Sequence, residues 1–212
     1  MNPTQIRREL LSKKVIENLK RRNISGYYAK TKEEAKTLAL GLINKGDIIG
    51  FGGSKSVEEI GLIDAMVKDG SYNLLLRNPS NSPEEAFELN RKMFYSDCYF
   101  MSTNALTEDG ILVNIDARSN RVAALCFGPL KVVMIVGMNK VEKDEAAAMQ
   151  RARNIAAPIN AQRFDIKTPC KTTGSCADCK SLDSICCQFV TTRFSRETGR
   201  MHVILVEEDL GF

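Results

Sequence analysis

A chain of 212 residues and 23.6 kDa is long enough to bury a substantial hydrophobic core without disulfides or metals. No apolar run approaches the roughly 20 residues of a membrane span, and the charged start MNPTQIRRELLSKK lacks the apolar part of a secretory signal, so we expect a cytoplasmic protein and no membrane partner. The net charge of +4 is concentrated near that terminus without a nucleic-acid reading motif, which predicts a solvated helix face and no nucleic-acid partner.

Predicted helices and apolar strands alternate through the first half of the chain. Residues 3–22 form a predicted amphipathic helix, which we expect either to cover the core or to contact a second copy in a homo-oligomer. Apolar segments typical of buried strands follow at 24–29, 47–51 and 72–76, and predicted helices separate them at 31–44, 56–68 and 82–96. This alternation favours a parallel sheet.

The second half begins with strand patterns in quick succession from residue 98, and the segment RVAALCF reads as one of them. A helix is predicted over 141–157, where Pro158 should end or kink it, and QFVTTRF with RMHVILVEE reads as a closing hairpin or strand pair. We therefore predict one α/β domain over 1–212, with a mostly parallel sheet flanked by helices, a small antiparallel insertion around 100–127 and a cysteine-rich loop at 168–187.

A glycine-rich turn in DIIGFGGSKSVEEIG connects an apolar strand to a helix. Glycines permit close approach of a ligand, and free backbone N–H groups at a helix start favour a phosphate or carboxylate. The candidate ligand residues are Gly50, Gly52, Gly53, Ser54 and Ser56. Alternatively the glycines only turn the chain and Ser56 forms a capping box with Glu59, and the two interpretations are compatible.

Polar residues near other strand ends are further candidates for binding a small anion. Asn104, Asp109 and Asn114 lie in STNALTEDGILVNID, although Asp109-Gly110 is also an ordinary turn sequence. Lys140 follows the apolar strand KVVMIVG, where it either meets an anionic ligand or lies at the surface. Ligands collect at the carboxyl ends of strands in open α/β sheets, which makes these positions candidate ligand contacts.

Five of the seven cysteines fall in CKTTGSCADCKSLDSICC. Their spacing, C-x5-C-x2-C-x6-C-C, favours a four-thiolate site for either a zinc ion or an iron–sulfur cluster. Free or redox-sensing thiols are one alternative, and a disulfide is another, disfavoured by a reducing compartment and an odd cysteine count. Adjacent Cys186 and Cys187 cannot easily both face one ion.

Several segments in chain order carry a family resemblance: GFGGSKSVEEIGL, STNALTEDGILVNID, NRVAALCFGPLKVVMIVGMNK, RNIAAPINAQR, TPCKTTGSCADCKSLDSICC and RMHVILVEEDLGF. In these segments, from about residue 4 to the end, the chain resembles the lactate-utilisation (LUD) domain family. The resemblance implies a fold similar to ribose-5-phosphate isomerase, glucosamine-6-phosphate deaminase and the CoA-transferases. It also implies a role beside iron–sulfur oxidoreductase subunits in an L-lactate oxidation system.

The resemblance bears on individual residues as well. In the related folds a glycine-rich turn contacts phosphate or CoA, and 50–56 match that turn in position, while the TEDGILVN run resembles a second ligand loop. No nucleophilic glutamate of the CoA-transferase kind is found. For the metal site, the resemblance favours a set of four cysteines, with Cys187 outside it: Cys170, Cys176, Cys179 and Cys186.

Two functional hypotheses therefore stand. The first is a component of a 2-hydroxy-acid oxidation system that binds a small anion at the glycine-rich turn and holds a metal at the cysteines. The second is a stand-alone enzyme acting on a sugar phosphate or CoA thioester, with Glu108 and Asp109 as the nearest acid–base pair. A thiol-based redox regulator is a third, weaker alternative.

Overall fold

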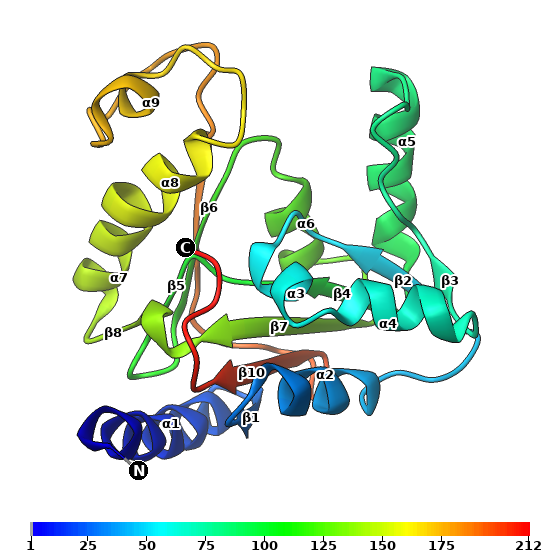
Figure 1. Cartoon of the computed structure of the whole chain (residues 1–212), viewed down its shortest axis with the longest axis vertical. Helices are drawn as coiled ribbons and strands as arrows, with labels where there is room; N and C mark the ends of the chain where they lie inside the picture. The colour runs from blue at the N-terminus through cyan, green and yellow to red at the C-terminus, as the bar shows by residue number, and fades with distance from the viewer. Residues whose placement is uncertain (1) are drawn as a thin grey trace.

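The computed structural model describes residues 2–212 and contains a parallel six-stranded sheet with helices on both faces (Figure 1). All five strand pairings in this sheet are parallel, which confirms the predicted α/β class. The strand order is β1 (Ser25–Ala29), β10 (Met201–Val206), β7 (Lys131–Gly137), β4 (Cys98–Met101), β2 (Ile48–Phe51) and β3 (Asn73–Leu74).

The central strands are apolar on both faces because both faces are covered. Alternate residues of β7 point in opposite directions, so that Val132 and Met134 join one core while Val133 and Ile135 join the other. The first core is covered by α1 (Pro3–Arg21) and α6 (Asn120–Cys126), and the second by α2 (Lys32–Leu40), α3 (Lys55–Glu59) and α4 (Leu62–Asp69).

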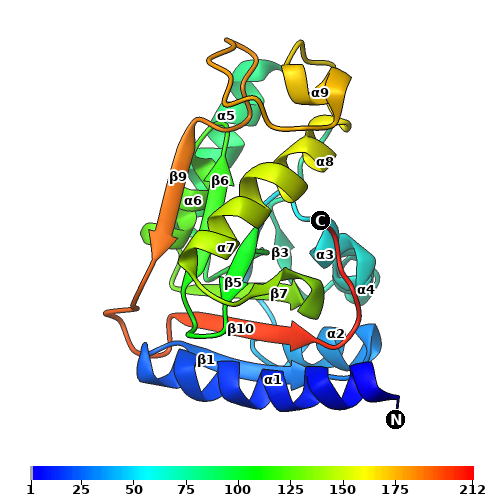
Figure 2. The ribbon, with the colours of Figure 1, turned by 90° about the vertical axis from the view of Figure 1, so that its left-hand side faces the viewer.

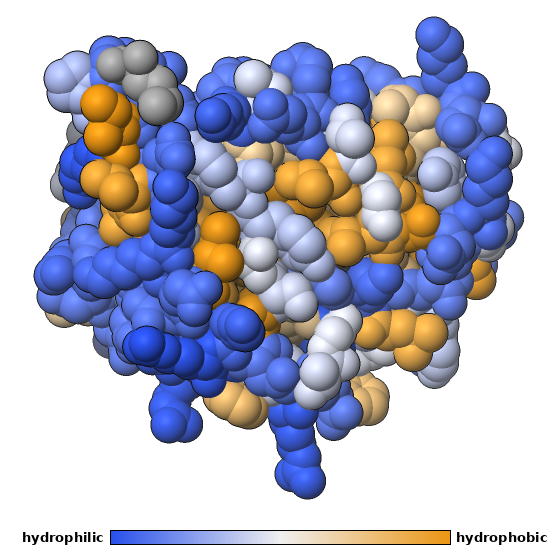
Figure 3. Space-filling model, turned by 90° about the horizontal axis from the view of Figure 1, so that it is seen from below, coloured by the Kyte–Doolittle hydropathy of each residue, from blue (hydrophilic) through white to orange (hydrophobic). Residues whose placement is uncertain are grey.

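Helix α1 begins with a capping box formed by Asn2 and Gln5 and lies along β1 (Figure 2). Its Val15 and Leu19 are fully buried in the first core, whereas Leu10 is 62% exposed. Figure 3 views the molecule from the side of α1 and α2 and shows apolar residues exposed among hydrophilic ones. The helix therefore covers the core, and its outer side keeps some apolar surface.

The predicted helix at 56–68 is two helices, α3 and α4. Gly61 separates them with a φ of +66°, a left-handed conformation that glycine adopts readily. The next helix is shorter than predicted, because α5 (Pro83–Lys92) is followed by the 3₁₀ turn η1 (Met93–Tyr95). Strand β3 is likewise reduced to two residues at the edge of the sheet.

A second sheet stands beside the main one, in the order β8 (Val141–Glu142), β5 (Ala105–Thr107), β6 (Leu112–Asp116) and β9 (Gln188–Thr192). The β5–β6 pair is antiparallel, as expected for the insertion around 100–127. Strand β9, from outside that insertion, also pairs antiparallel with β6, but β5 and β8 pair in parallel, so the small sheet is mixed. Strands β9 and β10 lie in different sheets, and the predicted closing hairpin is wrong.

The segment RVAALCF was also misassigned, because it forms helix α6 rather than a strand. The Asp116 carboxylate accepts hydrogen bonds from the backbone N–H groups of Arg121 and Val122, both at 3.1 Å. These bonds satisfy donors that a helix start leaves free, and the apolar residues are then buried on one side of a short helix.

The helix expected over 141–157 continues through Pro158. It runs as α7 (Glu145–Arg151), a π-helical turn (Ala152–Ala156) and α8 (Ala157–Ala161), as Figure 2 shows beside the small sheet. The wider π turn just before Pro158 suits a residue that has no N–H and a bulky ring. The remaining short elements are the 3₁₀ turn η2 (Met138–Lys140) and α9 (Pro169–Thr173), which opens the cysteine loop.

Candidate anion site and cysteine pocket

Three polar side chains meet beyond the carboxyl ends of the central strands β2, β4 and β7. The Lys140 ammonium donates hydrogen bonds to Ser56 Oγ at 3.0 Å and Ser102 Oγ at 3.1 Å. Ser56 lies in α3 after β2, Ser102 directly follows β4, and Lys140 ends the turn after β7. We refer to these three residues as the lysine cradle.

The cradle is buried. Lys140 is 3% exposed and Ser56 1%, and none of the ion pairs formed within residues 2–212 involves Lys140. Burial above all, and then the cations of Arg151 and Arg121, lower the pKa of Lys140 to about 7, while Glu59 acts in the opposite direction. Buried lysines are rare in proteins, and those that occur are usually paired with a carboxylate, which Lys140 is not.

A network centred on Arg121 adjoins the cradle through Ser102. The buried Arg121 guanidinium donates to the carbonyl of Ser102 at 3.0 Å, to Asn114 Oδ1 at 2.5 Å and to Asn104 Oδ1 at 3.1 Å. It also donates to the carbonyl of Ile115 at 2.8 Å. Burial lowers the pKa of Arg121, but an arginine begins so high that the group stays charged at neutral pH.

The second arginine beside the cradle is Arg151 of α7, which is 5% exposed. Its Nη1 donates to the carbonyl of Asn104 at 2.5 Å and its Nε to the carbonyl of Asn139 at 2.9 Å. The nearest carboxylate is Glu142, 3.9 Å from Nε. The edge of the sheet therefore gathers three cations, of which Arg121 and Arg151 each have a carboxylate at 3.9 Å, Asp116 and Glu142, while Lys140 has no ion-pair partner among residues 2–212.

Asn114 leaves one donor without a partner. Its side chain is fully buried, its Oδ1 is held by Arg121, and its Nδ2 has no hydrogen-bond partner among residues 2–212. The Arg121 guanidinium determines the orientation of the Asn114 amide, because it can only donate hydrogen bonds and must therefore face the oxygen and not the NH₂ group. An unsatisfied buried donor on a side chain bound to Arg121 is complementary to the oxygen of an anion.

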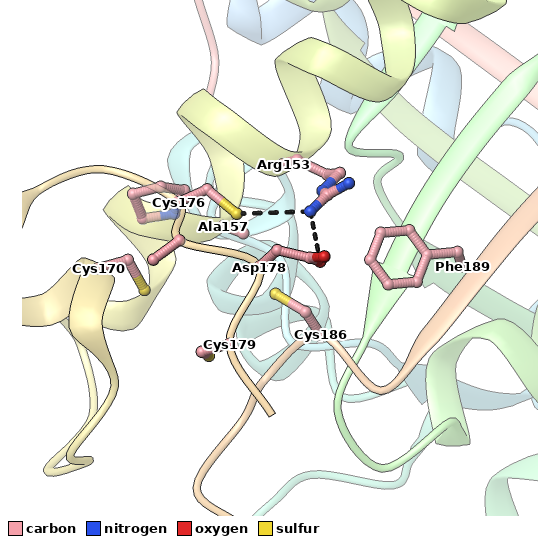
Figure 4. A pocket seen from close by; sticks show the side chains of 10 residues that line it. Arg153, Ala157, Cys170, Cys176, Asp178, Cys179, Cys186 and Phe189 are labelled. Carbon is pink, nitrogen blue, oxygen red and sulfur yellow. Dashed lines mark hydrogen bonds and ion pairs between the residues drawn. The ribbon is translucent and has the colours of Figure 1, made fainter. Parts of the chain in front are cut away.

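The cysteine loop forms a separate pocket, shown in Figure 4. A cavity of about 60 Å³ is lined by four cysteines together with residues of the π turn, α8 and β9: Arg153, Ala157, Pro158, Cys170, Cys176, Cys179, Cys186 and Phe189. Arg153 donates to Asp178 at 2.6 Å and lies 3.9 Å from Cys176 Sγ. All seven cysteines are free thiols.

The pocket has the thiol ligands that a metal site needs, but these thiols do not meet at one point. Within residues 2–212, no three cysteine, histidine or acidic side chains converge tightly enough to hold a metal ion. Burial, followed by the neighbouring cysteines, raises the pKa of Cys186 to about 11. Cys187 is exposed and donates to the carbonyl of Ser184, so it lies outside the group that lines the cavity.

Comparison with known proteins places the chain in a family. The family model for the LUD domain matches residues 12–206, nearly the whole chain. The chain belongs to the LUD domain family. No similar sequence was found among curated proteins.

A solved structure has a fold similar to that of this chain. The chain is similar to a DUF162 family protein from Deinococcus radiodurans, with a TM-score of 0.54 and 14% identity over 94% of this chain and 98% of that one. A weaker similarity, to eIF2B delta from Chaetomium thermophilum, has a TM-score of 0.35 and 18% identity over 56% and 52% of the two chains. At 14% identity, the similarity to the DUF162 family protein shows the fold alone. Within the described residues, no helix is long and apolar enough to cross a membrane.

The LUD domain brings four of the sequence candidates to the cradle and its network: Ser56, Lys140, Asn104 and Asn114. Gly52 lies beside them, because a Cβ on it would come within 3.2 Å of Arg121 Cγ. A Cβ on Gly53 would lie 3.2 Å from Arg77 Nη1. The glycines of this turn therefore make room for arginine side chains.

The remaining candidates have other partners. Gly50 is inside β2, where a Cβ would come within 2.8 Å of the Tyr99 ring. Asp109 is paired with Arg22 at the β5–β6 turn. Ser54 is the N-cap of α3, with its Oγ accepting from Val57 N at 3.3 Å, so the predicted capping box of Ser56 and Glu59 is wrong.

Arg121 and Arg151 were not predicted from the sequence. The sequence did carry a signal for a buried arginine. Each arginine lies in a short helical segment rich in apolar residues or alanine, NRVAALC and EAAAMQR, and packing of such a helix tends to bury the arginine as well. A buried arginine needs several acceptors, and the asparagines supply them here.

Proposed function

We propose that this LUD domain protein is a component of a 2-hydroxy-acid oxidation system, with L-lactate as the substrate, and that it binds a small carboxylate at the lysine cradle. The observation that carries the proposal is the Lys140 ammonium, which is buried beside two serine hydroxyls, without an ion-pair partner among residues 2–212. A buried cation is costly unless an anion compensates it.

The chemistry of the surroundings specifies the ligand class. Arg121 and Arg151 add positive charge, and the free Nδ2 of Asn114 offers a hydrogen bond to an oxygen. A carboxylate with an adjacent hydroxyl or carbonyl group supplies both the charge and the extra acceptor, as lactate and pyruvate do. Phosphate is the competing anion, since the same cations would bind it.

A thermal-shift titration tests the anion site. L-lactate, pyruvate, inorganic phosphate and an acyl-CoA are compared on the wild-type protein, on Lys140→Met and on the matched surface variant Lys143→Met, whose side chain is 73% exposed. We expect a carboxylate to stabilise wild type and Lys143→Met by about 2.7 kcal/mol at 100 times its dissociation constant. Lys140→Met should lose most of this stabilisation.

The pH dependence provides a second readout. Because the pKa of Lys140 is lowered to about 7, the ammonium is more fully charged at pH 6 than at pH 8.5, so wild type should bind the anion more tightly at pH 6. Stabilisation by acyl-CoA alone would contradict the proposal and favour the second hypothesis. Glu108 and Asp109, its acid–base candidates, are instead paired with Lys14, Lys143 and Arg22.

We further propose that Cys170, Cys176, Cys179 and Cys186 hold a metal centre. The support is that these four thiols line one cavity of about 60 Å³, with Cys187 turned away. Thiolates that surround a space, instead of meeting at a point, suit an iron–sulfur cluster better than a single zinc ion. Such a cluster would supply electron transfer to iron–sulfur oxidoreductase subunits in the cytoplasm.

Anaerobic purification followed by iron, sulfide and zinc analysis tests the metal centre. We expect iron and sulfide in wild type and in Cys126→Ser, which alters an exposed cysteine of α6, and loss of both in Cys176→Ser. Cys187→Ser should retain the metal. Stoichiometric zinc would contradict the cluster, and a wild-type protein that takes up neither metal after reconstitution would contradict the centre itself.

A further inference from the structure

The chain after β10 lies across the lysine cradle. Gly211 is close enough that a Cβ on it would come within 2.9 Å of Ser56 Oγ and 3.2 Å of Lys140 Nζ. The backbone of Gly211 therefore lies against both the Ser56 hydroxyl and the Lys140 ammonium and covers one side of the cradle. Figure 1 shows this end of the chain beside α3, next to the carboxyl ends of the central strands.

This segment is held by specific bonds. The Gly211 N–H donates to Glu59 Oε2 at 2.8 Å, and the N–H of Leu210, whose side chain is fully buried, donates to Asn139 Oδ1 at 3.1 Å. Arg8 of α1 binds the carbonyl of Glu207 and the carboxylate of Asp209 at the base of the segment. Glu59 thus serves the segment instead of capping α3.

Residues 211–212 are held more weakly than Leu210. Leu210 packs in the second core, whereas the polar contacts of residues 211–212 within the described chain are the hydrogen bond to Glu59 and the Arg163 guanidinium over the Phe212 ring, 5.9 Å from its centroid. One hydrogen bond and one cation–π contact hold residues 211–212 less firmly than burial in the core holds Leu210, so residues 211–212 can detach while Leu210 stays in place.

We propose that residues 208–212 form a strap that closes the lysine cradle, and that a ligand enters when Gly211 leaves Glu59. This inference rests on the cradle being the ligand site of the proposed function, and it adds how access to that site is controlled. Glu59 acts as a positioning residue, because it holds the strap without touching the ammonium through any bond. Gly211 is required because any side chain there would meet the cradle.

Accessibility of Lys140 tests the strap without any ligand. The wild-type protein is pulse-labelled with an amine-acylating reagent at pH 10.5, and labelling is followed for each peptide by mass spectrometry. At this pH an ordinary lysine is about half neutral, so a changed pKa alters the rate by no more than about twofold. Lys143, which is 73% exposed, serves as the internal reference.

The matched variants are Gly211→Ala and Gly199→Ala. Both glycines have positive φ values, +54° and +76°, so alanine strains the backbone at each, but a Cβ on Gly199 has no neighbour within 4 Å. We expect Lys140 to label far more slowly than Lys143 in wild type and in Gly199→Ala. In Gly211→Ala the labelling rate of Lys140 should rise roughly tenfold or more, because the added methyl group would clash with Ser56 and Lys140 and destabilise the closed position of the strap.

Glu59→Ala provides a second route to the open state, which keeps the test valid if Gly211→Ala folds poorly. It should raise Lys140 labelling severalfold and speed hydrogen exchange at the Gly211 amide, whose acceptor it removes. The strap is overturned if Lys140 labels as fast as Lys143 in wild type, or stays slow in both variants while the Gly211 amide exchanges freely. Failure of every anion to bind, with labelling as expected, would overturn the proposed function and leave the strap intact.

Discussion

At the scale of single residues, Lys140 and Arg121 show two ways in which this protein buries a cation. Arg121 donates to four acceptors from four different residues, and the Asp116 carboxylate lies 3.9 Å from its Nε. Lys140 has two hydroxyls and lies near two arginines. The difference predicts that Arg121 holds the structure together, whereas Lys140 destabilises it until a ligand binds.

Replacing Lys140 by methionine should change how stability depends on pH. The pKa is about 7 in the folded state and near 10.5 when unfolded, so the unfolded chain binds more protons between these values. Wild-type stability should therefore rise with pH from about 7 to 10, by up to several kcal/mol, relative to Lys140→Met. Urea unfolding of both proteins at pH 6, 8 and 10 measures this, and a difference that is constant with pH would contradict it.

Replacing Arg121 by methionine should cost about 3 to 5 kcal/mol of unfolding free energy, because four buried acceptors lose their donor. Arg121→Lys should recover only part of the loss, since one ammonium cannot reach acceptors arranged around a planar fork. Arg91→Met is the control, because Arg91 is 63% exposed in a surface ion pair and should contribute less than about 1 kcal/mol. Equal losses in the two arginine-to-methionine variants would refute the structural role.

At the scale of elements, the most instructive segments are those whose residues suit two structures. RVAALCF has the apolar content of a buried strand, and the Asp116 carboxylate stabilises the start of the helix that it forms instead. The helix through Pro158 persists because a π turn precedes the proline. Both outcomes depend on a local backbone arrangement that hydrophobic periodicity does not report.

Helix α1 offers a matched pair of leucines for an element-scale prediction. Leu19 is fully buried in the first core and Leu10 is 62% exposed. Leu19→Ala should lower the unfolding free energy by about 2 to 5 kcal/mol, while Leu10→Ala should change it by less than about 0.5 kcal/mol. If sedimentation shows an oligomer that Leu10→Ala dissociates, α1 is also a self-association surface. Similar losses of stability in the two variants would contradict the packing of α1 with Leu19 buried and Leu10 exposed.

At the scale of the whole molecule, one helical rod connects two chemically different sites. Arg151 in α7 faces the network beside the cradle, and two residues later Arg153 lines the cysteine pocket. The π turn between α7 and α8 begins between them, at Ala152. The residues that line the cysteine pocket make no hydrogen bond to the lysine cradle within the described chain.

The two sites should therefore behave independently. Cys186→Ser, which alters the pocket alone, should leave the thermal stabilisation by a bound carboxylate unchanged within about 0.5 kcal/mol, as expected for residues without shared partners. The measurement is the ligand titration of the anion test repeated on Cys186→Ser and on the surface variant Cys126→Ser. Loss of ligand stabilisation only in Cys186→Ser would show that α7 and α8 couple the sites.

The sequence by itself determined the α/β class, the parallel sheet and the family, because apolar runs, turn glycines and ordered motifs are properties of neighbouring residues. It also indicated Ser56, Asn104, Asn114 and Lys140, since each lies near a strand end. Only the tertiary structure decided that Arg121, Arg151 and the strap at Gly211 join them. Those contacts connect residues far apart in the chain, and their partners depend on which strands lie side by side.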